Sequence, residues 1–139
     1  MKTLKFRSES IISSAEELVL SFSSPSMNAE HLLLSIINDK NNGACKILKK
    51  IGIDLGKIKA ELERELKAQK TNQYELSPVS QKVFKILDYA QSFAKEMGKE
   101  IIDAEHLLLG ILKESTSFAS KLLLDNGVSI EKVLKEIKS

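Results

Sequence analysis

The six residues Ala29–Leu34 read AEHLLL, and the same six recur as Ala104–Leu109, 75 positions further along the chain. Sliding residues 28–62 by 75 positions lays them on residues 103–137 without a gap, and 13 of the 35 pairs are identical. Unrelated sequence would give about 2 identities over this length. Most matched positions are apolar residues, helix caps or glycine, so a structural unit has been duplicated.

Each copy is predicted to form four helices in the same order. The first helix of the first copy is expected to stop before the breaker cluster 23–26. Its counterpart in the second copy is expected to start with Ser77 as cap and Pro78 in the first helical position. The second helix of each copy should begin at Asn28 or Asp103, because these side chains accept hydrogen bonds from first-turn amides. A glycine in the left-handed region should end each third helix.

The duplication predicts one domain over residues 1–139, made of repeat 1 (4–66) and repeat 2 (77–138). A short polar connector, 67–76, joins them and is too short to make the repeats independent. The apolar face of each amphipathic repeat needs a partner, and the other copy is the nearest one. We therefore predict an all-α fold of eight helices in which the two four-helix repeats are related by a pseudo-twofold axis, with no competing strand signal.

Composition excludes several classes of protein. The chain has 139 residues, 42% of them hydrophobic, and its 21 Lys and Arg against 19 Asp and Glu give a net charge of +2 without a dense basic run, which disfavours nucleic-acid binding. The only cysteine, Cys45, excludes an internal disulfide, indicates a reducing compartment and is expected to be a core residue. There is no signal peptide pattern and no apolar run of the roughly 18 residues that cross a membrane. A cytoplasmic location without membrane partners is expected, or a location in the interior of an organelle after import.

One stretch of the sequence suggests a phosphate-binding loop and the two Glu-His pairs suggest a metal site, but neither has the residue spacing that such a site requires. Residues 52–58 resemble a phosphate-binding loop but have three residues between the glycines instead of four, and Ile instead of Ser or Thr after the lysine. If the twofold axis brought Glu30, His31, Glu105 and His106 together, they would supply four metal ligands, yet adjacent residues on a helix diverge by about 100°. We expect no catalytic residues, no metal and no cofactor in this chain. Metal binding stays the less favoured alternative, which a zinc titration of His31→Ala and His106→Ala would test.

The two copies of Asn/Asp-Ala-Glu-His-Leu-Leu-Leu, each followed by a leucine-rich turn with glycine at 48–53 and 123–128, are similar to the Clp N-terminal double repeat. This domain opens the Clp AAA+ unfoldases of the ClpA, ClpB and ClpC types, and the resemblance covers residues 4–137. It implies a non-catalytic module that receives unfolded or tagged substrates and adaptor proteins for a hexameric ATPase ring, which delivers them to a Clp protease or disaggregates them. ATP and Mg²⁺ are then expected only in the AAA+ part, outside this chain.

The resemblance also implies candidate binding residues. In ClpC-type members the glutamates of the two Glu-His motifs are associated with binding phosphorylated arginine, and these match Glu30 and Glu105. ClpC-like sequences usually have Gly-Thr before Glu-His, whereas this chain lacks the hydroxyl in both copies, which argues against phosphoarginine. ClpB-type members use an apolar groove, for which Leu4, Phe6 and Tyr74 are candidates. The second copy favours the ClpC type slightly over ClpB.

Two parent proteins stay open. In the first, the natural polypeptide continues past Ser139 into an AAA+ motor with a true phosphate-binding loop. In the second, the chain is a stand-alone accessory protein made of Clp repeats, which docks on a Clp protease complex and ends near Ser139.

Overall fold

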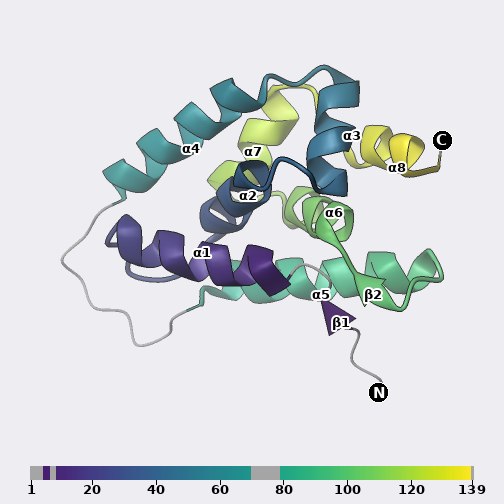
Figure 1. The fold of residues 1–139 in the computed structure, drawn as a ribbon, viewed down its shortest axis with the longest axis horizontal. Helices are drawn as coiled ribbons and strands as arrows, with labels where there is room; N and C mark the ends of the chain where they lie inside the picture. Colours follow the sequence, from purple (N-terminus) through teal and green to yellow (C-terminus); the bar gives the residue numbers. More distant parts are fainter. Residues whose placement is uncertain (1–4, 7–8, 70–78, 139) are drawn as a thin grey trace.

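The computed structural model describes residues 5–6, 9–69 and 79–138. Repeat 1 and repeat 2 each contribute four helices to this part of the chain (Figure 1). The helices are α1 (Glu9–Ser21), α2 (Ala29–Asn38), α3 (Gly43–Ile51) and α4 (Leu55–Ala68), then α5 (Gln81–Glu96), α6 (Ala104–Glu114), α7 (Phe118–Asp125) and α8 (Ile130–Lys138). The predicted all-α fold of eight helices is confirmed.

A feature that the sequence did not predict is a small strand pair. Strands β1 (Lys5–Phe6) and β2 (Ile101–Ile102) run parallel, with Lys5 opposite Ile101. Two residues are too few to show the alternation by which a strand is recognised. The pair connects the start of repeat 1 to the segment before α6 in repeat 2.

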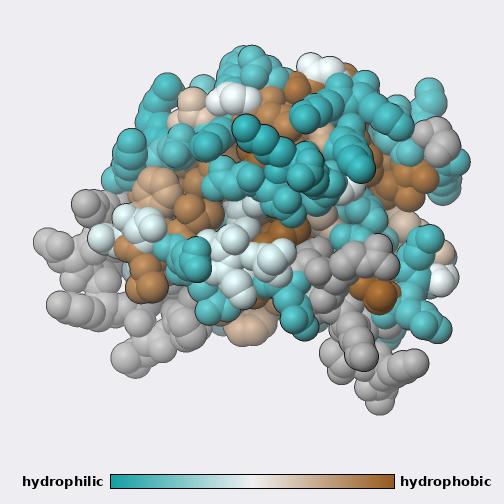
Figure 2. Space-filling model, in the orientation of Figure 1, coloured by the Kyte–Doolittle hydropathy of each residue, from teal (hydrophilic) through white to brown (hydrophobic). Residues whose placement is uncertain are grey.

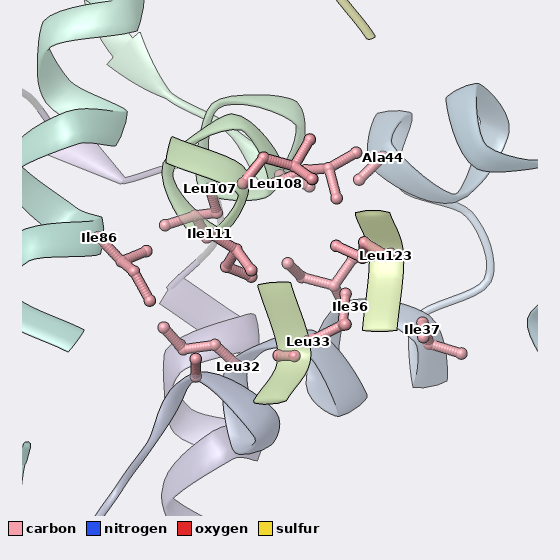
Figure 3. Packing of buried hydrophobic residues seen from close by; sticks show 14 of the residues in the cluster. Leu32, Leu33, Ile36, Ile37, Ala44, Ile86, Leu107, Leu108, Ile111 and Leu123 are labelled. Atoms are coloured by element: carbon pink, nitrogen blue, oxygen red, sulfur yellow. The ribbon is translucent and has the colours of Figure 1, made fainter. Parts of the chain in front are cut away.

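The repeated AEHLLL stretch lies at the centre of the molecule. All residues of 29–37 on α2 and, apart from Glu105, of 104–112 on α6 are buried. Side chains from both helices point into one interior, Leu32 and Ile36 from α2 and Leu107 and Ile111 from α6 (Figure 3). Helix α2 contacts α7 of the other repeat, and α6 contacts α3 in the same reciprocal way. Because these helices are surrounded on every side, nearly every position along them is constrained by packing.

Helices α5 and α6 approach each other more closely than a Cβ atom would allow. A Cβ added at Gly110 would lie 2.5 Å from the Ile86 carbonyl oxygen on α5. At the matching position of repeat 1, Ser35 donates a hydrogen bond from its hydroxyl to the Ile11 carbonyl oxygen at 2.6 Å. The same helix pair is thus held by direct backbone packing in one repeat and by a hydroxyl bridge in the other.

The predicted helix starts are confirmed except at α5. Asn28 and Asp103 are the N-caps of α2 and α6. Helix α5 begins at Gln81 with Ser80 as its cap, so the prediction of a start at Pro78 is wrong; Ser77 and Pro78 themselves lie outside the described residues. The reason is a contact between the repeats, because the Ser80 amide donates to the Met27 carbonyl oxygen at 2.9 Å and keeps this segment extended.

The remaining sequence expectations at element ends are met. Helix α1 ends at Ser21, before the breaker cluster, and Gly52 after α3 has φ = +100°, which glycine adopts without strain. Cys45 is fully buried on α3, and its thiol donates to the Ile36 carbonyl oxygen at 3.1 Å. It is a core residue, as predicted.

Candidate functional site

The histidine of each Glu-His motif closes the start of its own helix. The amide of Asn28 donates to His31 Nδ1 at 2.9 Å, and the amide of Asp103 donates to His106 Nδ1 at 2.9 Å. This contact requires an unprotonated Nδ1, so in His31 the proton lies on Nε2, which is 2.9 Å from the Ser24 hydroxyl oxygen. Burial lowers the pKa of His31 to about 4 and also lowers the pKa of His106. Both rings therefore act as neutral capping groups.

Glu30 reaches across to the other repeat. Its side chain is buried, and Oε2 accepts a hydrogen bond at 3.2 Å from the amide of Ala119, the second residue of α7. Gln69, at the end of α4, donates to Oε1 at 3.4 Å. Burial raises the pKa of the Glu30 carboxyl group. Glu30 therefore joins α2 to the N-terminus of α7, where a carboxylate is electrostatically favoured.

Glu105 lies in the corresponding place on the other side of the pseudo-twofold axis. A Cβ on Gly43, the first residue of α3, would collide with Glu105 Oε2. Adding the repeat offset of 75 to Gly43 gives Phe118, the first residue of α7, so the two contacts are equivalent. Glu105 is only partly buried. Each glutamate thus lies against the first turn of a helix that belongs to the other repeat.

The structure does not bring the two Glu-His motifs together. Glu30 lines a pocket of about 290 Å³ with Gln69, Lys82 and Phe118. Glu105 lines a different pocket of about 300 Å³, formed by residues 98–101, Asp103 and His106. No group of three or more potential metal-ligating side chains occurs in the described parts of the chain. The four-ligand metal site considered from the sequence is therefore not assembled.

Three further candidates came from the family resemblance. Leu4 and Tyr74 lie outside the described residues. Phe6 is the second residue of β1, where its backbone pairs opposite Ile102. The structure describes the position of its backbone only.

An apolar groove between α1 and α5 was not identified from the sequence. It has a volume of about 480 Å³, and eight of its nine lining residues are apolar: Ile12, Val19, Leu20, Met27, Val79, Val83, Phe84 and Leu87, with Glu16 as the ninth. Two of these side chains are well exposed, Leu20 at 80% and Phe84 at 55%. Hydrophobic residues reach the surface at several places in Figure 2, including the region of α1. We call this site the α1–α5 groove.

One signal in the sequence pointed to the groove. Leu20 and Phe84 are large apolar residues that fall outside the core-facing stripes of their helices. On a helix that packs with one face, such positions are normally polar. An off-stripe Leu or Phe on each of two neighbouring helices therefore marks an apolar surface, but their proximity follows only from the packing of α1 beside α5.

Comparison with known proteins places the fold. The family model described as the Clp repeat (R) N-terminal domain matches residues 4–126 and 78–139. The chaperone protein ClpB of Oceanobacillus iheyensis is 26% identical over 133 residues, which are 94% of this chain and 16% of that protein. The negative regulator of genetic competence ClpC/MecB of Bacillus subtilis shows the same identity and coverage, 26%, 94% and 16%. The chain thus spans about a sixth of the length of these curated relatives.

Solved structures show the same architecture. The N-terminal domain of Hsp104 from Candida albicans superposes with a TM-score of 0.74 at 16% identity, over 97% of this chain and 89% of that one. The ClpV N-domain in complex with a VipB peptide has a TM-score of 0.74 at 17% identity, over 96% of this chain and 84% of that one. In the described part of the chain, no helix is long and apolar enough to span a membrane. The chain belongs to the Clp repeat (R) N-terminal domain family.

Proposed function

We propose that this chain is the substrate- and adaptor-binding N-terminal module of an ATP-dependent Clp unfoldase, and that the α1–α5 groove receives apolar protein segments. The observation that carries the proposal is the groove itself, because apolar lining on two helices with Leu20 and Phe84 exposed is typical of a protein-binding surface. The ClpV N-domain, which has the same fold, has been solved with a peptide bound, and this supports a peptide-binding role here.

The proposal assigns no catalysis to this chain. ATP and Mg²⁺ would be used by an AAA+ part that lies elsewhere in the parent protein. The two curated relatives are several times longer than this chain, which is consistent with such a part. Unfolded or tagged proteins and adaptor proteins would be the partners, in the cytoplasm, and a Clp protease would receive the unfolded product. Six modules on a hexameric ring would capture weakly bound segments efficiently, since multivalency raises the effective concentration.

The alternative is a stand-alone accessory protein of Clp repeats that docks on a Clp protease complex. The intact mass of the natural product and the coding sequence beyond Ser139 separate the two. A much longer product with a phosphate-binding loop supports the unfoldase, and a product of about this length supports the accessory protein.

A matched pair of truncations tests the binding role of the groove. Phe84→Ala is expected to weaken binding of a fluorescent, permanently unfolded polypeptide about tenfold, because burial of a Phe side chain on binding is worth roughly 1.5–3 kcal/mol. Leu124→Ala on α7 removes another exposed apolar side chain, 44% exposed and outside the groove. It is expected to bind like the wild type, as measured by fluorescence anisotropy. Equal affinities of the wild type and Phe84→Ala would contradict the proposal.

The Glu105 pocket is a second candidate contact for an adaptor or a tagged substrate. Glu105 is partly exposed and lines its pocket, whereas the carboxylate of Glu30 is buried against α7. We therefore expect charge reversal at Glu105 to affect partner binding directly. Charge reversal at Glu30 is expected to act mainly through stability, because it would bury a lysine against a helix N-terminus.

A further inference from the structure

The α1 wall of the groove carries negative charge only. Helix α1 contains Glu9, Glu16 and Glu17 and no Lys or Arg. Glu16 lines the groove itself and is exposed. The whole chain has a net charge of +2, so this wall is opposite in sign to the molecule as a whole.

The α5 wall does not compensate this charge. Asp88 is exposed one turn after Phe84 and shares its side of the helix. Lys82 lies on another side of α5, in the pocket with Glu30. Measured from Phe84, Lys85 lies about 100° around the helix and Asp88 only about 40°, since successive residues are about 100° apart. The charged residue of the groove lining is therefore Glu16 on α1, and the charged side chain within one turn of Phe84 that lies nearest to it around α5 is the acidic Asp88.

The size of the groove limits what it can hold. Its α1 wall runs from Ile12 to Leu20, which is about 12 Å at 1.5 Å per residue. This length matches two turns of a helix or about four residues of extended chain. An occupant that covers the floor also comes close to the Glu16 carboxylate and displaces part of its water.

We infer that the α1–α5 groove selects short amphipathic segments that place Lys or Arg beside their apolar side chains. The inference rests on the proposed function, namely that the groove binds apolar segments. A neutral segment would leave the Glu16 carboxylate partly desolvated and unpaired, and an acidic segment would add repulsion. A segment with apolar and basic side chains fills the apolar floor and also pairs with the Glu16 carboxylate. The partner is therefore a protein segment that combines apolar residues with Lys or Arg.

Three labelled peptides of identical length and apolar residues test this selectivity on the 139-residue chain. They carry Lys, Gln or Glu at the same positions beside the apolar residues. At low salt the Lys peptide is expected to bind roughly two- to fivefold more tightly than the Gln peptide for each pair formed, and the Glu peptide more weakly than both. The differences are expected to shrink at high salt, because screening weakens charge pairing at the rim.

Variants locate the source of the preference. Glu16→Gln is expected to reduce the preference for the Lys peptide, and Glu16→Lys to reverse it toward the Glu peptide. The control is Glu131→Lys, which changes the net charge by as much as Glu16→Lys does. Glu131 is exposed on α8, away from α1 and α5 (Figure 1), so this variant is expected to keep the wild-type preference.

The outcomes separate the inference from the proposed function. If all three peptides bind equally and Phe84→Ala weakens all of them, the charge selectivity is wrong and the binding role of the groove stands. A preference for Lys that persists in Glu16→Lys also overturns the inference. If no peptide binds, or if Phe84→Ala binds the peptides with the same affinity as the wild type, both the inference and the proposed function fail.

Discussion

At the scale of single residues, the Glu-His pair divides two tasks between neighbouring side chains. His31 turns back to accept from the amide of its own N-cap, and Glu30 reaches forward to the amide of Ala119 in the other repeat. A Glu or Gln usually takes the first role in a capping box. Here the histidine caps the helix and leaves the glutamate free to join the two repeats.

His31→Gln tests the capping role, because Gln keeps an acceptor at this position but does not titrate. The pKa of His31 is lowered by burial from 6.5 to about 4, so the unfolded state binds more protons between these values. The contribution of the neutral His31 ring to the free energy of unfolding is complete above pH 6.5 and is lost as the pH falls through 4. The contribution that is lost is roughly 3 kcal/mol. In urea unfolding, the wild type is expected to lose stability relative to His31→Gln between about pH 7 and pH 4.

Both proteins in that comparison keep Glu30, whose raised pKa has the opposite effect on stability, so its contribution largely cancels. His106→Gln is a second comparison, since burial lowers the pKa of His106 too, and it is expected to change in the same direction. A stability difference between wild type and His31→Gln that stays constant with pH would show that the ring does not titrate in this way.

At the scale of elements, the two repeats solve the same packing problem differently. Gly110 lets the α6 backbone approach the Ile86 carbonyl oxygen, whereas Ser35 fills the equivalent space in repeat 1 with a hydroxyl. Gly110 aligns with Ser35, so this position differs between the two repeats. The difference marks the place where α6 packs on α5 in another way than α2 packs on α1.

Gly110→Ala is expected to destabilise the protein by about 1–3 kcal/mol, the usual range for overpacking a core. This loss would occur although Ala is intrinsically better than Gly in a helix by about 1 kcal/mol. Gly56→Ala on α4 is the matched control, because Gly56 is exposed and a Cβ there meets only the end of the Asp54 side chain, at 3.3 Å. It is expected to be neutral or stabilising in the same urea titration. Equal effects of the two substitutions would argue against close α5–α6 packing.

At the scale of the whole molecule, the two repeats share one hydrophobic core. Helices α2 and α6 are buried over most of their length, and each contacts helices of the other repeat. The β1–β2 pair and the Met27–Val79 bridge add backbone contacts between the halves. A repeat alone would expose the leucines of its central helix to water.

Polypeptides 1–69 and 70–139 are therefore each expected to lack cooperative unfolding when studied separately. Mixing them is expected to restore helical circular dichroism and a single thermal transition, because the interface between the repeats contains the core. The intact chain under the same conditions is the reference. Cooperative unfolding of 1–69 by itself would show that repeat 1 is an independent domain.

The sequence by itself determined the duplication, the eight helices and most helix ends. These features depend on repeat spacing, apolar periodicity and capping residues, which act over a few neighbouring positions. The tertiary structure alone decided that Glu30 and Glu105 each meet a helix of the other repeat, that α5 starts at Gln81, and that α1 and α5 enclose an apolar groove bordered by Glu16. Each of these depends on contacts between residues far apart in the chain, and local patterns do not encode which distant faces meet.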